Sequence, residues 1–184
     1  MTGIIFELLE EAVTRRYGPD VWPRMLARAG ARGYQRFGRY RDEDLFTLLE
    51  ALPMAADTPL ADRLRWFGRS VIPLLAERYP QIFAPHSSAE SFLLALNEIL
   101  HPNGTPSDVE AGPLDLEVMA SGPGGGLVLG YRSARRLCAL AEGFVTGAAD
   151  YYREHVRIEQ PRCMLYGEER CALVCIFEPV LSTT

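Results

Sequence analysis

The sequence has few histidines and cysteines, no apolar run long enough to cross a membrane, and no excess of basic charge. It contains 184 residues, with 3 His, 4 Cys and a formal net charge of -5. A membrane-spanning helix needs roughly 20 apolar residues, and the apolar start of the chain meets Glu7 too early for a secretory signal. Scattered arginines in an acidic chain disfavour nucleic-acid binding. We therefore expect a cytoplasmic protein with no membrane span, whose cysteines are thiols or metal ligands.

The chain is long enough for one domain with a substantial hydrophobic core. Hydrophobic residues make up 48% of the sequence, which excludes a disordered chain. At about 150 residues per domain, the length predicts a single domain over residues 1–184. No internal repeat and no long linker divides it.

Apolar residues recur at helical spacing from residue 4 to about residue 101. Helix-ending glycines and prolines and helix-starting polar residues divide this stretch into five predicted helices. The first ends at Gly18–Pro19, the second stops at Gly30, the third is capped by Asp42 or Asp44, the fourth opens at Thr58–Pro59, and the fifth runs from a capping box at 87–90 to His101 and Pro102.

The second half of the chain alternates between strand and helix patterns. Apolar and polar residues alternate around 114–118, and a strand pattern resumes at 127–129 after a glycine-rich turn at 121–126, which predicts a hairpin. A long helix follows over about 134–154, and a second hairpin closes the chain. The predicted fold is α+β, with an N-terminal helical layer followed by a four-stranded antiparallel sheet, made of two hairpins with the long helix between them.

His101 is the one histidine placed at the end of an apolar helix. It either closes that helix by bonding free carbonyl groups or presents a ring nitrogen to an iron in an apolar slot. The three histidines show no zinc-hydrolase spacing. The glycine run lacks a phosphate-loop ending and precedes a strand, so it predicts a hairpin turn.

Tyr131, Ser133 and Arg135 alternate at a strand-to-helix junction. If the backbone there is extended, a phenol, a hydroxyl and a guanidinium share one face, and this set suits a carboxylate. The alternative is that Ser133 caps the following helix and the arginines are solvated.

The Tyr131-x-Ser133-x-Arg135 spacing, the start Met1-x-Gly3-Ile4-Ile5-Phe6 and the histidine-bearing helix about 30 residues before the motif resemble the H-NOX (haem nitric oxide/oxygen binding) family. The resemblance runs over about residues 1–178. It implies haem b between the helical layer and the sheet, His101 as the iron ligand, a proline at Pro113 that presses on the porphyrin, and propionates held by Tyr131, Ser133 and Arg135. Pro102 departs from the family pattern, because it ends the helix at the ligand.

The same resemblance bears on the gas and on the partner. Oxygen-binding members carry a distal tyrosine where this chain has Leu140, and Ile5 and Leu9 would form the other apolar side. An apolar wall favours NO, and also CO, over dioxygen, unless a group such as Tyr166 reaches in. The resemblance implies a sensor rather than an enzyme, with a separate histidine kinase or cyclic-di-GMP enzyme as its partner.

The cysteines suggest a second site. Cys163 and Cys171 are equidistant from Gly167, so a symmetric hairpin would place them opposite each other. Some family members bind structural zinc through such a pair, a cysteine that matches Cys138, and a Cys or His three residues before the pair, where this chain has Gln160. Cys175 lies too far along its strand to replace that ligand. We therefore expect free thiols rather than a zinc site completed by His155.

Two alternative functions remain open at this point. One is a haem-free relative that uses the fold as a protein- or lipid-binding module. The other is a redox switch based on Cys138, Cys163 and Cys171.

Overall fold

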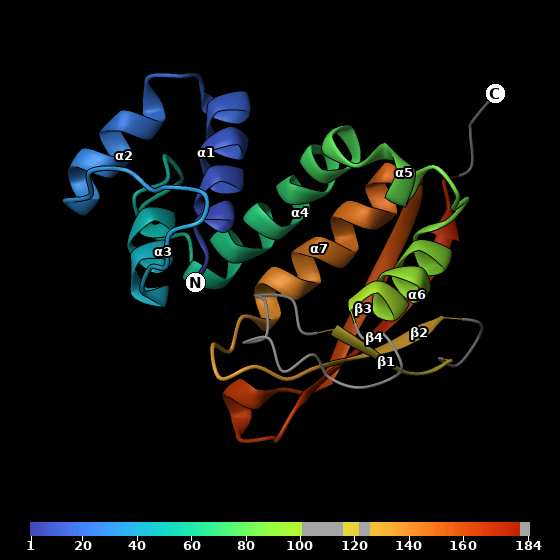
Figure 1. Ribbon diagram of the computed structural model, residues 1–184. Helices are drawn as coiled ribbons and strands as arrows, with labels where there is room; N and C mark the ends of the chain where they lie inside the picture. The colour runs from blue at the N-terminus through green and yellow to red at the C-terminus, as the bar shows by residue number, and fades with distance from the viewer. Residues whose placement is uncertain (101–115, 122–125, 181–184) are drawn as a thin grey trace.

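The computed structural model describes residues 1–100, 116–121 and 126–180. Six helices precede the first strand among these residues, and a seventh lies between two antiparallel hairpins (Figure 1). The helices are α1 (Gly3–Tyr17), α2 (Val21–Ala29), α3 (Asp42–Glu50), α4 (Leu60–Arg78), α5 (Pro80–Phe83), α6 (Ala89–Leu100) and α7 (Cys138–Tyr151). The strands are β1 (Leu116–Ser121), β2 (Leu127–Tyr131), β3 (Glu154–Arg162) and β4 (Cys171–Pro179), with a short 3-10 turn, η2 (Met164–Tyr166), before β4. This arrangement confirms the α+β class.

The four strands form one antiparallel sheet in the order β1-β2-β4-β3. The two predicted hairpins are therefore joined through β2 and β4, with Tyr131 opposite Cys171 and Leu129 opposite Leu173. Alternate residues of the edge strand β3 are exposed, because successive side chains of a strand point to opposite faces of the sheet and one face is turned to solvent. The sheet brings the end of β2 and the start of β4 to the same place, next to the first residue of α7.

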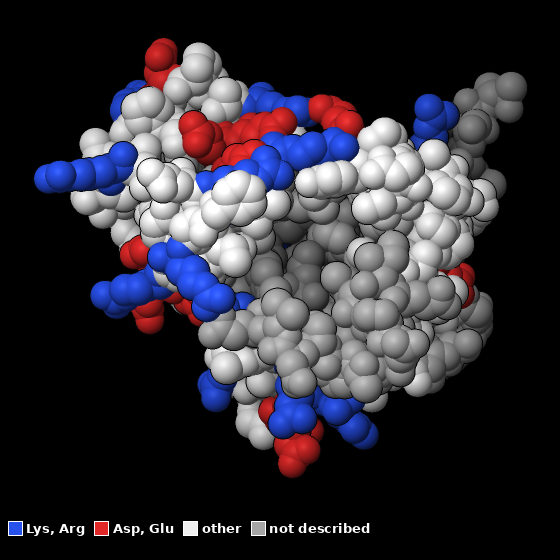
Figure 2. Space-filling model, in the orientation of Figure 1, with Lys and Arg blue, Asp and Glu red and all other residues white. Residues whose placement is uncertain are grey.

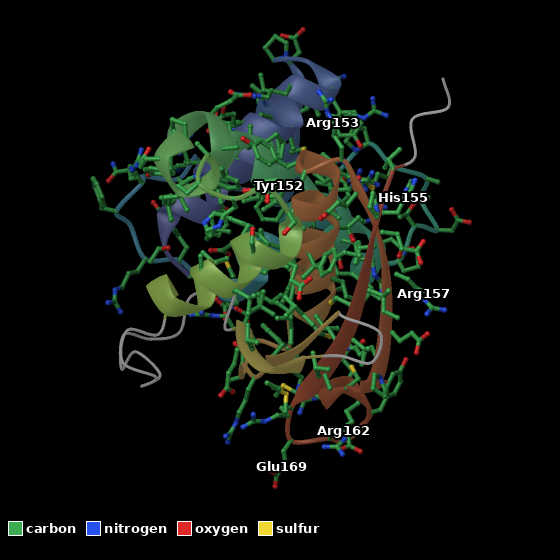
Figure 3. The ribbon with its side chains drawn as sticks, turned by 90° about the vertical axis from the view of Figure 1, so that its right-hand side faces the viewer. Tyr152, Arg153, His155, Arg157, Arg162 and Glu169 are labelled. Carbon is green, nitrogen blue, oxygen red and sulfur yellow. The ribbon has the colours of Figure 1, made fainter. Side chains whose placement is uncertain are left out.

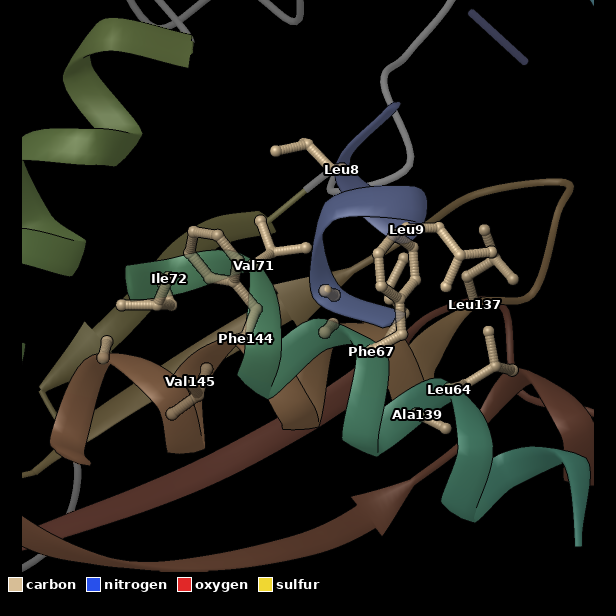
Figure 4. Packing of buried hydrophobic residues seen from close by; sticks show 14 of the residues in the cluster. Leu8, Leu9, Leu64, Phe67, Val71, Ile72, Leu137, Ala139, Phe144 and Val145 are labelled. Carbon is tan, nitrogen blue, oxygen red and sulfur yellow. The ribbon is translucent and has the colours of Figure 1, made fainter. Parts of the chain in front are cut away.

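Helices α4 and α7 cross at very close range, and small residues make this possible. A Cβ atom added at Gly143 would lie 2.1 Å from the carbonyl oxygen of Arg65, and one added at Gly68 would lie 2.2 Å from the carbonyl oxygen of Leu140. Neither distance is compatible with a side chain. The two helices therefore pack backbone against backbone, and Figure 4 shows the apolar side chains that surround this crossing.

The N-terminal helices α1 to α3 lie beside α4, away from the sheet (Figure 1). The core between them consists of fully buried side chains such as Phe6, Leu9, Leu45 and Phe67. On the surface, Arg78 of α4 lies 3.0 Å from Glu7 and 2.6 Å from Glu11 of α1. Figure 2 shows charged side chains of both signs gathered in this region. Apolar packing and ion pairs thus both connect α1 to α4.

Several element ends differ from the sequence prediction. The third helix begins with Asp42 inside it rather than as its cap, and the fourth begins one residue after Pro59. The predicted long helix over 134–154 is shorter, since α7 begins at Cys138 and ends at Tyr151. The capping box at 87–90 is displaced by one residue, because Ser88 accepts the N–H of Ser91 at 3.1 Å.

Among the described residues, no helix has both the length and the apolar character needed to cross a bilayer.

Candidate functional site

Tyr131 ends β2 with its side chain fully buried. Its hydroxyl oxygen accepts the backbone N–H of Leu137 at 2.9 Å. Burial raises the pKa of Tyr131 to about 12, although hydrogen bonds with Ser133 and with the Leu137 backbone act in the opposite direction. The phenol therefore stays protonated at any physiological pH and remains a hydrogen-bond donor.

Ser133 and Arg135 lie in a turn between β2 and α7, which corrects the expectation of an extended backbone there. The N–H of Arg136 bonds the Ser133 carbonyl at 3.0 Å, and Arg136 has a φ of 52°. The Ser133 hydroxyl accepts the N–H of Arg135 at 3.3 Å. Ser133 does not cap α7, whose flanking residue is Leu137. The Ser133 hydroxyl thus belongs to a turn rather than to a strand face, and the alternative that Ser133 caps α7 is wrong.

The Arg135 guanidinium holds a carboxylate in this structure. Its Nε atom donates to Oδ2 of Asp42 at 2.9 Å. The other oxygen of Asp42 lies 3.2 Å from the buried N-terminal ammonium of Met1, which also donates to the Tyr40 carbonyl at 2.6 Å. Asp42 joins the start of α3, the N-terminus and the turn before α7. The arginine is thus positioned for the bonding that a carboxylate requires.

The sequence predicts Asp42 only as a possible helix cap and does not predict its contact with Arg135. The two residues are 93 positions apart in the chain. Their opposite charges were the only available signal, and many acidic residues share that property. Only the tertiary fold singles out this pair.

Apolar side chains of α1 and α7 belong to the same buried core as Leu137, which precedes α7. Leu140 is buried in the first turn of α7. Leu9 of α1 and Leu137 are both fully buried, and Figure 4 shows them among the side chains of this core. Ile5 is partly buried against the same core. Tyr166 is 89% exposed on η2, so it does not reach into this region as one alternative supposed.

His101 and Pro113 lie outside the described residues, so the structure does not place them. The helix that leads to His101 is described up to Leu100. Its N-terminus is fixed by Glu154 of β3, whose carboxylate accepts the N–H of Ala89 at 2.9 Å. Because helix N-termini attract negative charge, this contact anchors α6 to the sheet. The sequence prediction did not find Glu154, which reaches α6 from across the chain.

Three of the four cysteines converge at the end of the sheet. The sulfur atom of Cys163 lies 3.9 Å from that of Cys138 and 3.9 Å from that of Cys171. The predicted proximity of Cys163 and Cys171 is confirmed. Cys175 is buried elsewhere on β4, as expected, and donates weakly to the carbonyl of Leu173 at 3.7 Å.

His155 cannot complete a zinc site with these thiols. It is exposed on β3 and pairs with Glu178, whereas Cys171 lies at the other end of β4. Cys171 and Glu178 are seven residues apart on β4, and seven residues of an extended strand span about 23 Å. The alternative of a zinc site completed by His155 is therefore wrong.

The chain matches known proteins over most of its length. The family model described as Haem-NO-binding matches residues 2–160. The crystal structure of an H-NOX protein from S. oneidensis in its Fe(II)NO state is 26% identical, covers 97% of this chain and 99% of that chain, and has a TM-score of 0.81. The H-NOX domain from Shewanella oneidensis in its Fe(II)CO state is also 26% identical, with coverages of 99% and 100% and a TM-score of 0.72.

A third solved structure supports the fold alone. It is the oxygen complex of an H-NOX domain related to soluble guanylate cyclases, with 21% identity, coverages of 100% and 99%, and a TM-score of 0.75. A search of curated proteins found no match.

The helical layer and the four-stranded sheet, together with the family match, define a haem-binding gas-sensor domain. The chain belongs to the Haem-NO-binding, or H-NOX, family. Domains of this family are sensors and not catalysts, so the expectation that the chain is not an enzyme is confirmed.

Proposed function

We propose that the chain is a cytoplasmic nitric oxide sensor that binds NO at ferrous haem b and signals to a separate protein. His101 would bind the iron, and Tyr131, Ser133 and Arg135 would hold the propionates. Ile5 and Leu140 would line the side where the gas binds, with Pro113 pressing on the porphyrin. When bound, haem supplies the ferrous iron that NO and CO ligate.

The contact that best supports this proposal is the one between Arg135 and Asp42. The Arg135 guanidinium is bonded to a carboxylate, and the Tyr131 hydroxyl bonds the backbone of Leu137, two residues further along the same connection. A propionate offers the same chemistry as the Asp42 carboxylate, and an arginine or a tyrosine hydroxyl binds it with charge-assisted hydrogen bonds. This donor set fits the carboxylates of haem.

The choice of NO rests on the apolar character of the residues on the gas side. Bound dioxygen carries partial negative charge and needs a hydrogen-bond donor, whereas NO and CO bind ferrous haem without one. Leu140 and Leu9 are buried and offer no donor. The S. oneidensis protein, whose structure was solved with NO, shares this chain's fold over nearly its whole length.

Signalling requires that a partner distinguish two states of the domain. His101, the residue after the described end of α6, would hold the iron, and the haem would supply the position where NO binds. A change at that position would reach the rest of the domain through α6. A partner that responds must bind the two states with different affinity, typically by about 1–3 kcal/mol. A histidine kinase or a cyclic-di-GMP enzyme encoded separately is the expected class of partner.

The absorption spectrum of the purified, reduced protein tests this proposal. We expect a Soret band, a spectral change on adding NO, and no stable oxygenated spectrum in air. Protein that folds but cannot be reconstituted with haem would support the haem-free binding module instead. A stable oxygenated spectrum would contradict the gas assignment while leaving haem binding intact.

A further inference from the structure

The three converging cysteines form a buried group at the foot of the sheet, distinct from the residues assigned to haem. Cys138 is the first residue of α7, Cys163 follows β3, and Cys171 is the first residue of β4. All three side chains are buried, and their sulfur atoms lie within 4.8 Å of one another. In Figure 3, sulfur atoms lie near the hairpin end marked by Arg162 and Glu169.

These thiols do not match the ligand set of a structural zinc site. Structural zinc almost always takes four protein ligands. Among the described residues, no fourth Cys, His, Asp or Glu joins the three sulfur atoms. Gln160 is the nearby side chain that could approach the sulfurs, and its neutral amide is a poor ligand for zinc. Among the described residues, the cluster therefore lacks the fourth ligand of a structural zinc site.

The spacing of the sulfur atoms suits an ion that needs only three ligands. Two of the three distances are 3.9 Å, and the third is at most 4.8 Å. The point equidistant from all three sulfurs then lies about 2.3–2.5 Å from each, close to the roughly 2.3 Å of a metal–thiolate bond. An ion in the plane of the sulfurs would bind all three with little rearrangement.

Three polar groups next to the cluster can interact favourably with negative charge on the sulfurs, in opposition to the effect of burial. Cys138 begins a helix of 14 residues, whose N-terminus carries partial positive charge. The N–H of Met164 donates to the sulfur of Cys171 at 3.3 Å. The Gln160 Nε2 atom is buried with no hydrogen-bond partner among the described atoms, so it has N–H groups to offer a thiolate.

We propose that Cys138, Cys163 and Cys171 bind one Cu(I) ion in trigonal thiolate coordination. Soft thiolate ligands favour Cu(I), and three sulfurs complete its trigonal coordination, whereas structural zinc takes a fourth protein ligand. Three sulfurs within 4.8 Å of one another leave room for a single ion and not for an iron–sulfur cluster. Each copper–sulfur bond replaces an S–H bond, and the proton leaves to solvent. The copper stays in the +1 state, so no oxidant or reductant takes part. Gln160 hydrogen-bonds to a thiolate instead of binding the metal.

Competition against coloured chelators under anaerobic, reducing conditions tests this site. The purified protein is titrated with Cu(I) against bicinchoninate and, separately, with Zn²⁺ against a zinc indicator. We expect one tightly held Cu(I) per chain, thiolate-to-copper absorption in the near ultraviolet, and three sulfur neighbours at about 2.3 Å by X-ray absorption. Zinc held as tightly as Cu(I), or no retained copper, would overturn the proposal.

Three variants separate the site from general effects on folding. Cys138→Ser should weaken Cu(I) binding at least tenfold, whereas Cys175→Ser, at the buried thiol outside the cluster, should leave it unchanged. Gln160→His supplies an imidazole as fourth ligand and should strengthen zinc binding at least tenfold. Equal loss of copper in both serine variants, or no gain of zinc in Gln160→His, would contradict the proposed ligand set.

Protection of thiols in the unmodified protein gives a measurement that does not depend on any variant. Cu(I) should slow alkylation of Cys138, Cys163 and Cys171 in partly denatured protein, as read by mass spectrometry, and leave the rate at Cys175 unchanged. Uniform protection of all four thiols would point to general stabilisation and overturn the assignment.

Discussion

Arg135 and Asp42 are bonded in this structure, although one precedes α7 and the other begins α3. The side chain of Arg135 is 21% exposed and that of Asp42 is 30% exposed, so solvent weakens the pair only in part. This pair connects the N-terminal helices to the proposed propionate clamp. A change at either residue should therefore affect both haem retention and the attachment of α3.

Arg135→Ala should weaken haem retention. It removes a charge-assisted hydrogen bond worth about 1.5–3 kcal/mol, which corresponds to a loss of affinity of roughly 10- to 150-fold. Transfer of haem to an apomyoglobin acceptor measures the effect as a faster rate. Arg132→Ala, at an exposed neighbour, is the matched control. A normal transfer rate in Arg135→Ala would contradict the clamp.

Asp42→Asn should lower the free energy of unfolding by about 1 kcal/mol, the upper end for a partly exposed ion pair. It weakens the contacts with both Arg135 and the N-terminal ammonium. Urea unfolding followed by circular dichroism measures this change. Glu43→Gln, in the same turn but in an exposed pair with Arg41, should have almost no effect. Equal effects of the two variants would show that the pair adds nothing to stability.

His101→Gly should lose haem unless free imidazole is supplied. The variant removes the proposed iron ligand and leaves a space that imidazole can fill. The Soret band, with and without imidazole during purification, measures this outcome. His155→Gly, on the exposed face of β3, should keep a normal spectrum. A normal ferrous spectrum of His101→Gly without imidazole would remove the ligand assignment.

Gly143→Ala should destabilise the fold by about 1–3 kcal/mol. The added Cβ would lie 2.1 Å from the Arg65 carbonyl oxygen, which forces α4 and α7 apart. This cost exceeds the roughly 1 kcal/mol that alanine gains over glycine in a helix. Thr146→Ala, on the less buried face of α7, is the control and should change stability little. Thermal unfolding distinguishes the two variants.

Stability should fall as the pH rises above about 9, partly because of Cys175. Burial raises the pKa of this thiol to about 12 in the folded protein, from 9.0 otherwise. Between these values the unfolded chain loses the proton and the folded chain keeps it, so unfolding becomes more favourable. Urea midpoints at pH 8 and pH 11 measure the loss. Cys175→Ala should show a smaller loss over this interval, and an unchanged loss would contradict the burial effect.

Local patterns predicted most of the elements but few of the contacts between them. Gly18 and Gly30 marked helix ends because their positive φ values of 93° and 67° are ones that other residues avoid. The alternation at Tyr131, Ser133 and Arg135 predicted an extended backbone, whereas Ser133 and Arg135 lie in a turn, and the two conformations cannot be told apart from this spacing. Asp42 and Glu154 could not be found from the sequence, because their partners are 93 and 65 residues away. The convergence of Cys138 with the hairpin thiols likewise depends on the order of strands in the sheet.

The anchoring of α6 by Glu154 has a mechanical consequence for the histidine helix. The helix is held at Ala89 and continues for 12 residues toward His101. At 1.5 Å per residue it is about 18 Å long, so a pivot of about 5° around the anchored end displaces the far end by roughly 1.6 Å. A rotation about the anchored end would therefore displace the end of α6 next to His101 much more than the end that contacts the sheet.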